Sequence, residues 1–334
     1  NFDDPTPGPG EVVLEMKASG MCGSDLKFYR SAPGEAMKAL GFAPGTEVIA
    51  GHEPCGVVVA VGANVNPKQA RIGQRVMVHH YRGCGACPHC STGWQQLCVE
   101  GVAEVYGVTH HGSHARYMKV PASTLVTLRE ELSFSTGAAI ACGTGTAWGG
   151  LHRLELAAEH TVAIFGQGPV GLSATLLAAA MGARVIALDV SDERLARARE
   201  LGAAHTVNPA RDDAVAAIRE LTGGLGAHGA FEAASSPQAR QQAVQCVRTW
   251  GKVVFIGEGG QVTLDVSPDL LRRQVTLMGS WTFSTVGQKA CTDFIADRGI
   301  DVDALFTHRW TLEQADEAYR IFDAQTSGKG VFLL

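Results

Sequence analysis

The first third of the chain carries short runs of β-branched and other apolar residues, separated by Gly, Pro and Asn. Short runs bounded by turn residues are typical of β-strands in an all-β domain. We therefore predict a barrel-like, β-rich domain in this part of the chain. Its strands are expected at Glu11–Ala18, Cys55–Val61, Ile72–Val78 and Tyr117–Val120.

From Thr161 onward the pattern changes to apolar strands that alternate with helical segments. This alternation predicts a parallel sheet covered by helices, an α/β architecture. A helix at Pro169–Met181 begins with proline in its first turn and stops before Gly182, and one at Ser191–Leu201 begins with a capping serine. The six expected strands are Val162–Phe165, Arg184–Leu188, His205–Val207, Ala230–Ala233, Lys252–Ile256 and Val275–Met278.

The alternation stops after about Thr282, and helices are expected at Ala290–Arg298 and Leu312–Ala324 before a closing strand. We expect this tail to return to the β-rich domain. The predicted domains are therefore 1–142 with 283–334, and 143–282. The lone thiol of Cys142 lies at the boundary between them.

Composition excludes some classes of partner. The chain has 334 residues and a formal net charge of -5, so it offers no broad basic surface for nucleic acid, and small molecules are the expected ligands. The uncharged run Thr161–Ala183 is long enough to span a membrane, but Gly166, Gly168 and Pro169 near its start interrupt a continuous helix. We therefore expect no membrane span.

A glycine motif follows the first strand of the second domain and opens its first helix. It reads Gly166-Gln167-Gly168-Pro169-Val170-Gly171, and this position is typical of a turn that binds the pyrophosphate of a dinucleotide. Asp189, at the end of the next strand, can accept hydrogen bonds from an adenosine ribose and would repel a 2′-phosphate, which favours NAD over NADP. Arg194 lies nearby and weakens that preference. The alternative is a glycine turn used only for packing.

Four of the nine cysteines lie close together as Cys84, Cys87, Cys90 and Cys98. Short CxxC pairs of this kind place thiolates around one tetrahedral ion. Metal-binding thiols favour a reducing compartment, and because no signal peptide opens the chain we expect the cytoplasm. Four thiolates leave no open coordination position, so such a zinc ion would be structural. An iron–sulfur cluster, disulfides and unconnected thiols remain as alternatives.

Four further candidate ligands, Cys22, His52, Glu53 and Cys142, lie far apart in the sequence, and no local spacing groups them. Asp25 follows Cys22 closely and could hydrogen-bond the free ring nitrogen of a ligating histidine. For the remaining thiols, Cys55, Cys246 and Cys291, we expect simple burial. His79 and His80 are expected at a strand end, in hydrogen bonds or along a pocket.

Several segments together resemble the zinc-dependent medium-chain alcohol dehydrogenases over nearly the whole chain. The segments are Gly20–Asp25, Gly51–Glu53, the four-cysteine segment 84–98, Cys142–Thr146 and the Gly166 turn. The resemblance implies a Rossmann doubly wound parallel sheet joined to a GroES-like barrel. It also implies two zinc ions per chain, of which the catalytic one would be held by Cys22, His52 and Cys142.

The same resemblance implies roles for further residues. Ser24 matches a hydroxyl that relays the alcohol proton, Asp25 the partner of the ligating histidine, and Thr146 a contact near the nicotinamide. Glu53 matches a carboxylate that lies near the metal and sometimes ligates it. Lys27 stands where some relatives have a histidine at the outer end of the proton relay, so the resemblance does not define the route by which the proton leaves.

The function implied is hydride transfer between an alcohol, a secondary alcohol or polyol, and NAD, in a homodimer or homotetramer. A second hypothesis is a non-catalytic dinucleotide-binding relative with the same fold. It would need the Gly166 turn but not the joint presence of Cys22, Ser24, His52 and Cys142. A third hypothesis, an iron–sulfur electron carrier, depends on the four-cysteine segment alone.

Overall fold

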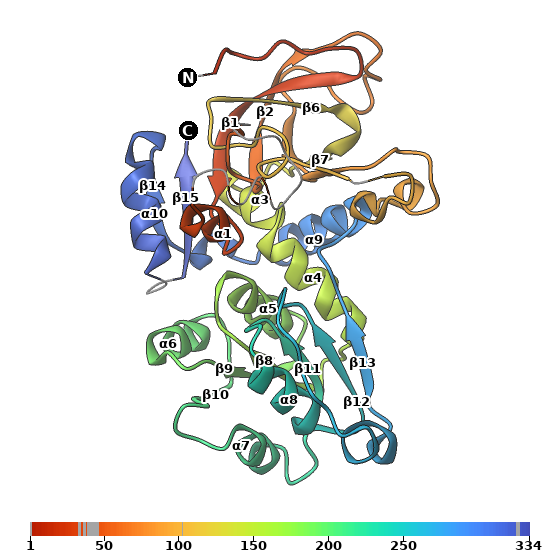
Figure 1. The fold of residues 1–334 in the computed structure, drawn as a ribbon, viewed down its shortest axis with the longest axis vertical. Helices are drawn as coiled ribbons and strands as arrows, with labels where there is room; N and C mark the ends of the chain where they lie inside the picture. The colour runs from red at the N-terminus through yellow and green to blue at the C-terminus, as the bar shows by residue number, and fades with distance from the viewer. Residues whose placement is uncertain (1, 33–34, 36–37, 39–46, 102, 325–327) are drawn as a thin grey trace. The chain divides into compact units, whose positions relative to one another are not determined.

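The computed structural model describes residues 2–32, 35, 38, 47–101, 103–324 and 328–334. The chain divides into two compact units, Asn1–Gly145 with Phe283–Leu334, and Thr146–Thr282. The C-terminal segment, blue in Figure 1, belongs to the unit that the N-terminal strands build. The boundary between the units falls within helix α4 (Gly143–Leu154), shortly after Cys142.

The first unit is built on a seven-stranded sheet in which β1 is central. The order is β14-β15-β1-β2-β3-β7, and β6 also pairs with β1. Alternate residues of β1, Val12, Leu14 and Met16, are fully buried on one face because successive side chains of a strand point to opposite faces. The strands are β1 (Glu11–Gly20), β2 (Pro54–Val61), β3 (Arg75–Val78), β6 (Tyr117–Pro121), β7 (Leu125–Thr127), β14 (Phe306–Trp310) and β15 (Lys329–Leu333).

One predicted strand was wrong at its start. The strand expected at Ile72–Val78 begins only at Arg75, and Ile72 is 71% exposed. Gly73 has a φ of 83° and forms a turn just before the strand, which an extended segment cannot contain. The apolar side chain of Ile72 therefore marks the turn rather than the sheet.

The helices of the first unit are α1 (Asp25–Arg30), α3 (Phe134–Ile140), α9 (Thr285–Arg298) and α10 (Ala315–Asp323). The two helices predicted in the tail are thus present, and α9 begins earlier than predicted because Ser284 caps it by accepting the Gly287 amide. Helix α3 was not predicted; its residues between Phe134 and Ile140 are small and buried. A two-stranded sheet pairs β4 (Tyr81–Arg82) with β5 (Glu104–Val105). Short 3₁₀ helices lie at Cys90–Thr92, Gln95–Leu97, Ala122–Thr124, Val302–Leu305 and Leu312–Gln314.

The second unit is a six-stranded parallel sheet with the order β10-β9-β8-β11-β12-β13. All six predicted strands are present, but β11 and β12 begin earlier than predicted. The strands are β8 (Thr161–Phe165), β9 (Arg184–Leu188), β10 (His205–Val207), β11 (Ala227–Glu232), β12 (Val247–Phe255) and β13 (Thr276–Gly279). The helices are α5 (Pro169–Ala180), α6 (Asp192–Glu200), α7 (Ala214–Leu221) and α8 (Pro237–Cys246), with short helical turns at Val266–Leu270 and Leu271–Arg273.

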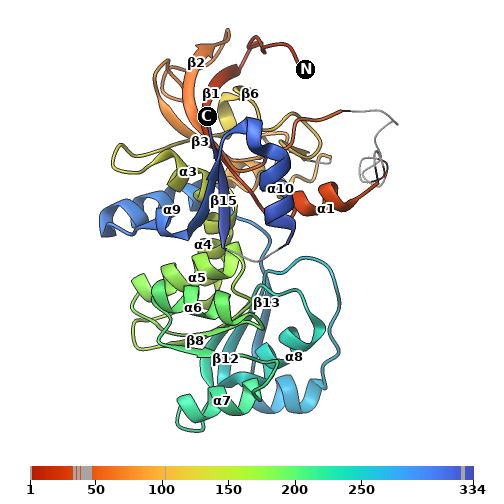
Figure 2. The same ribbon diagram turned by 90° about the vertical axis from the view of Figure 1, so that its left-hand side faces the viewer.

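The strand order fixes where this sheet can bind a ligand. Right-handed crossovers place α5 with α6 on one face and α7 with α8 on the other, and these pairs are in contact (Figure 2). The order reverses between β8 and β11, and parallel sheets of this kind bind ligands outside the carboxyl ends of the strands at such a point. The Gly166 turn lies at that point. Among the described residues, no helix is long and apolar enough to cross a membrane.

Candidate metal centre and cofactor site

Three side chains from separate parts of the first unit meet around one point. Cys22 follows β1, His52 precedes β2, and Cys142 lies between α3 and α4. The Sγ atoms of Cys22 and Cys142 are 3.9 Å apart, and the three potential ligand atoms lie within 4.8 Å of one another. Two thiolates bound to one tetrahedral zinc ion are about 3.8 Å apart. The three residues therefore fit a zinc ion and leave its fourth position open.

Asp25 holds two of these three residues in place. Its Oδ2 accepts the Cys22 amide at 2.8 Å, and its Oδ1 lies 2.9 Å from His52 Nδ1. In zinc sites, a carboxylate that is hydrogen-bonded to one ring nitrogen of a histidine leaves the other nitrogen to bind the metal. His52 Nε2 is the nitrogen so directed, and it lies 3.0 Å from Ser24 Oγ.

The charges of this group suit a cation. A hydrogen bond from the Cys142 thiol, followed by the neighbouring His52, lowers the pKa of Cys22 well below its usual value, in spite of burial. Burial opposes protonation of His52, but Asp25 outweighs it and raises the pKa of the imidazole. A thiolate is thus favoured at Cys22, and thiolates are the form of cysteine that binds zinc.

Glu53 forms a buried ion pair that sequence reasoning did not predict. Its Oε2 lies 2.5 Å from Nζ of Lys329, and both side chains are almost fully buried. The Lys329 ammonium also donates to the Met21 carbonyl at 3.1 Å. Burial raises the pKa of the Glu53 carboxyl to about 7, although Lys329 opposes the shift. Within the described residues, the group of potential ligand atoms comprises those of Cys22, His52 and Cys142, without Glu53.

His79 and His80 lie beside this group as hydrogen-bonded, buried side chains. His80 Nδ1 lies 3.1 Å from the Ala141 carbonyl, and its ring meets the His52 ring edge to face with centroids 5.3 Å apart. His79 Nε2 lies 3.0 Å from the Phe283 carbonyl. Burial lowers the pKa of both imidazoles, so both are neutral at pH 7. His80 therefore presents a neutral ring next to the potential metal ligands.

Lys27 and Thr146 occupy different settings. Lys27 is exposed on α1, where its amide donates to the Ser24 carbonyl at 3.1 Å. Its side chain is thus one turn along the same helix that Ser24 begins. Thr146 is buried in α4 and is the first residue of the second unit.

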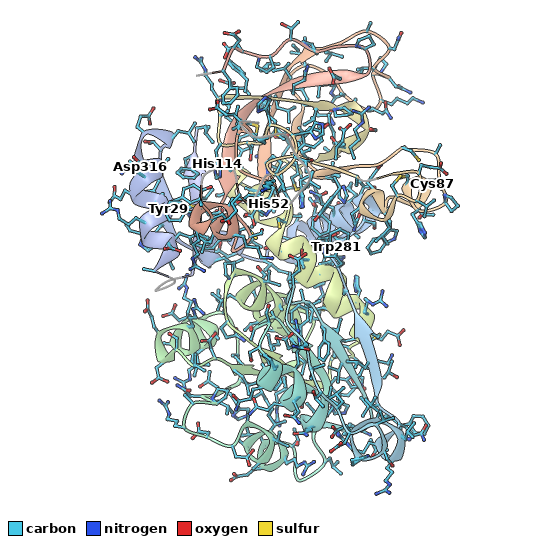
Figure 3. All side chains as sticks on the ribbon, in the orientation of Figure 1. Tyr29, His52, Cys87, His114, Trp281 and Asp316 are labelled. Atoms are coloured by element: carbon cyan, nitrogen blue, oxygen red, sulfur yellow. The ribbon has the colours of Figure 1, made fainter. Side chains whose placement is uncertain are left out.

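The four cysteines Cys84, Cys87, Cys90 and Cys98 converge in a lobe, residues 84–98, away from His52 within the first unit (Figure 3). The Cys84 sulfur accepts amide hydrogen bonds from Ala86 at 3.4 Å and Cys87 at 3.3 Å. Backbone amides of Cys90 and Val99 lower the pKa of the Cys87 thiol to about 6. Amide donors of this kind stabilise thiolates, so the lobe fits a closed four-thiolate zinc site.

The glycine motif forms a cradle at the N-terminus of α5. Gly166 has a φ of 85°, a left-handed conformation that favours glycine. A Cβ at position 171 would lie 1.7 Å from the Gly166 carbonyl oxygen, so only glycine fits there. At Gly168 a Cβ would meet nothing within 4 Å. Helix α5 begins at Pro169, which has no N–H, and Gly168 is its N-cap. The open space at this helix N-terminus fits a pyrophosphate.

Asp189 lies at the end of β9 and is tied to the glycine turn. Its Oδ2 accepts the Gln167 amide at 2.7 Å, and its Oδ1 accepts the Ser191 amide at 2.9 Å. Arg194, on α6, lies 3.7 Å from the same carboxylate. Because Arg194 is paired with Asp189, its charge is partly neutralised at the position where a ribose would bind.

An open Cys₂His metal group in a β-rich unit, together with a glycine turn on a doubly wound parallel sheet, defines a metal- and dinucleotide-dependent dehydrogenase. The comparisons with known proteins agree. The family model for an alcohol dehydrogenase GroES-like domain matches residues 8–130, and that for a zinc-binding dehydrogenase matches residues 169–297. The chain belongs to the zinc-dependent medium-chain alcohol dehydrogenases, oxidoreductases that act on the CH–OH group of donors.

Among individual relatives, the zinc-type alcohol dehydrogenase-like protein YphC of Escherichia coli (strain K12), itself uncharacterized, is 38% identical over 98% of this chain and 92% of its own. Sorbitol dehydrogenase of Bacillus subtilis (strain 168) is 31% identical over 92% of this chain and 85% of its own. The solved structure of alcohol dehydrogenase TADH from Thermus sp. ATN1 has a TM-score of 0.89 and 27% identity, covering 100% of this chain and 95% of that one.

Proposed function

We propose that this protein transfers hydride between a secondary alcohol or polyol and NAD, with one catalytic and one structural zinc ion per chain. The observation that carries the proposal is that Asp25 contacts both Cys22 and His52. These contacts position two of the three potential ligands in a group with an open fourth coordination position. The similarity to a sorbitol dehydrogenase supports the polyol class. A catalytic zinc ion, when bound, would act as a Lewis acid on the substrate oxygen.

The chain's own residues supply a path for the substrate proton. Ser24 Oγ lies 3.0 Å from His52 Nε2, so a hydroxyl held beside the three ligand atoms can pass its proton to Ser24. Ser24 stands at the start of α1 and is partly exposed, and Lys27 on the same helix is exposed. We propose that the proton leaves along this helix face. Glu53, paired with Lys329, adds negative charge behind the ligands without occupying a ligand position.

We propose NAD rather than NADP as the acceptor because the Asp189 carboxylate stands at the ribose end of the glycine turn. Its negative charge would repel a 2′-phosphate. Thr146 is proposed to contact the nicotinamide, a role carried by its place four residues after Cys142 in the sequence.

We further propose a homodimer or homotetramer in a reducing compartment such as the cytoplasm. Strand β13 is an edge of the six-stranded sheet, and Leu277 on it, Trp250 and Leu271 are 36%, 73% and 61% exposed. Exposed edges with apolar side chains favour pairing with another chain. All nine cysteines are free thiols, which suits a reducing compartment. Light scattering of the purified protein tests the assembly.

The test of the proposed activity combines metal analysis with turnover. About two zinc ions per chain and NADH formation from secondary alcohols or polyols are expected. Cys142→Ala should lose one zinc ion and reduce turnover by about a hundredfold or more, since changing a residue that only hydrogen-bonds a metal ligand already costs about 10- to 100-fold. The matched control is Cys291→Ala, a buried thiol on α9, which should keep both properties.

Three outcomes would count against the proposal. NADH binding with no turnover on any alcohol would favour the non-catalytic dinucleotide-binding relative. One zinc ion or none in the native protein would exclude the two-site interpretation, and a coloured iron–sulfur protein would do the same.

A further inference from the structure

A buried ion pair joins the end of β11 to helix α8 in the second unit. Glu232 is the last residue of β11 and is fully buried, and Arg240 on α8 is 6% exposed. Arg240 Nε lies 3.4 Å from Glu232 Oε2. Replacing such a pair by apolar residues often leaves a protein as stable or more so, because burying two charges is costly. Stability alone therefore does not explain why this buried ion pair is present.

The Glu232 carboxylate shapes the loop that follows β11. Its Oε1 accepts the amides of Ala234 at 2.8 Å and Ser235 at 2.6 Å. Ser235 has a φ of 63°, a left-handed conformation that is costly for a residue other than glycine and must be held by its surroundings. The carboxylate thus fixes the backbone of residues 233–235 in one conformation.

The Arg240 guanidinium fixes the loop that follows β12. Its Nη2 donates to the Gly257 carbonyl at 2.7 Å and to the Gly259 carbonyl at 2.5 Å. The two loops also touch directly, because a Cβ at Gly257 would lie 2.4 Å from Ser235 Oγ. One ion pair therefore holds the loops after β11 and β12 against each other.

The same loops touch the glycine turn. A Cβ at Gly166 would lie 2.9 Å from the Ala234 amide nitrogen and 3.0 Å from the Ala233 carbonyl carbon. The Ala233 amide donates to the Phe165 carbonyl, directly before that turn, at 2.8 Å. Three loops at the carboxyl ends of β8, β11 and β12 are thereby joined, at the edge of the sheet where a dinucleotide binds in folds of this order.

We propose that Glu232 and Arg240 are positioning residues for the dinucleotide: the pair keeps the three loops preformed so that the nicotinamide nucleotide binds without first ordering them. This inference depends on the proposed NAD cofactor. Preformed loops lower the entropic cost of binding, so loss of the pair weakens the cofactor complex and leaves the metal group in the first unit unchanged. Neither residue needs to touch the cofactor.

The experiment compares two arginines that each bond two backbone carbonyls. Arg240→Met removes the proposed brace. Arg273→Met is the matched control, because Arg273 bonds the carbonyls of Val244 and Val247 where α8 ends and β12 begins. NADH is titrated into each full-length variant by energy transfer from tryptophan, and zinc content, the KM for NAD, the KM for the alcohol and kcat are measured.

Arg240→Met is expected to raise the NADH Kd and the KM for NAD about tenfold or more, the effect of losing one hydrogen bond to a charged group. The KM for the alcohol, the zinc content and kcat at saturating NAD should stay near wild type, and Arg273→Met should leave the Kd unchanged. A purely structural role would instead lower the active fraction, and so kcat, with the KM for NAD unchanged. Glu232→Gln keeps an acceptor for both loop amides and should weaken NADH binding less than Arg240→Met.

The inference is overturned if folded Arg240→Met binds NADH within twofold of wild type, or if Arg273→Met weakens binding equally. If Arg240→Met does not fold, the titration of Arg240→Lys decides, since a lysine cannot bond both loops at once and should also raise the Kd. Wild-type protein that binds no NADH would contradict the proposed function itself, whereas a wild type that binds with unaffected variants contradicts only the role of the pair.

Discussion

Gly168 and Gly171 belong to one motif, and each is a glycine for a different physical reason. At position 171 a Cβ would lie 1.7 Å from a backbone oxygen, so the folded chain has no room for it. At position 168 the chain leaves open space and the backbone has a φ of -74°, which any residue adopts. Gly171 is therefore required by the fold, whereas no contact within the chain requires Gly168, which suits close approach of a ligand to the helix N-terminus.

Substitution by alanine should separate these two requirements. Gly171→Ala is expected to lower the thermal midpoint, at a cost of about 1–3 kcal/mol for overpacking. Gly168→Ala should leave the midpoint near wild type and raise the NADH Kd, because its methyl group fills the space of the pyrophosphate. Thermal unfolding and NADH titration of both variants check this, and equal loss of stability in the two would contradict it.

At this scale the sequence predicted some contacts and not others. Asp25 was expected beside a ligating histidine because its short distance from Cys22 kept it near the metal group, and it does lie 2.9 Å from His52. The pairing of Glu53 with Lys329 left no sequence signal. It arises only because β15, at the other end of the chain, pairs with β1 beside β2. Interactions across the sheet between distant segments have no local spacing to reveal them.

Among elements, the lobe 84–98 is the one whose site could be predicted from spacing alone. All four thiols come from one short segment, and the structure brings them together with amide donors to the Cys84 sulfur. The Cys22, His52 and Cys142 group needed the resemblance to known dehydrogenases. The expected strands are present, but the short strands β4, β5, β7 and β14 were not predicted. Ile72 was misassigned because Gly73 forms a turn there, and α3 was missed because its mostly small, buried residues show no alternation of apolar and polar positions.

Loss of one lobe ligand should affect the lobe and spare the sheet. Cys98→Ser is expected to lower zinc content from about two ions to about one per chain, because a closed site depends on all four thiolates. The lobe should then become sensitive to limited proteolysis, while NADH binding by the second unit persists. Metal analysis and mass spectrometry of the fragments measure this. Cys55→Ala, a buried thiol of β2, is the control, and unchanged zinc in Cys98→Ser would count against the closed site.

Across the whole molecule, the nine cysteines fall into chemically distinct sets. Six belong to the two potential metal groups. The other three, Cys55, Cys246 and Cys291, are fully buried, as the sequence led us to expect. Burial raises the pKa of Cys246 to about 12 and raises those of Cys55 and Cys291 further above the usual value. Amide hydrogen bonds lower the pKa of Cys98 and bring that of Cys87 to about 6.

Alkylation should report these sets in an order that depends on metal and pH. With zinc bound, all nine thiols should react slowly, because the ligands are occupied and the rest are buried. After chelation, the three thiols with a lowered pKa, Cys22, Cys87 and Cys98, should be labelled by iodoacetamide at pH 7 before the core thiols, since the thiolate is the reacting form. From pH 7 to pH 9 the rate at Cys87 should change little, because this thiol is already mostly ionised above its pKa of about 6. The rate at Cys246, far below its pKa of about 12, should rise about a hundredfold, one factor of ten per pH unit.

Peptide mass spectrometry at both pH values measures the rates, and early labelling of Cys246 or Cys55 in the folded, zinc-free protein would contradict the assignment of these thiols to the core.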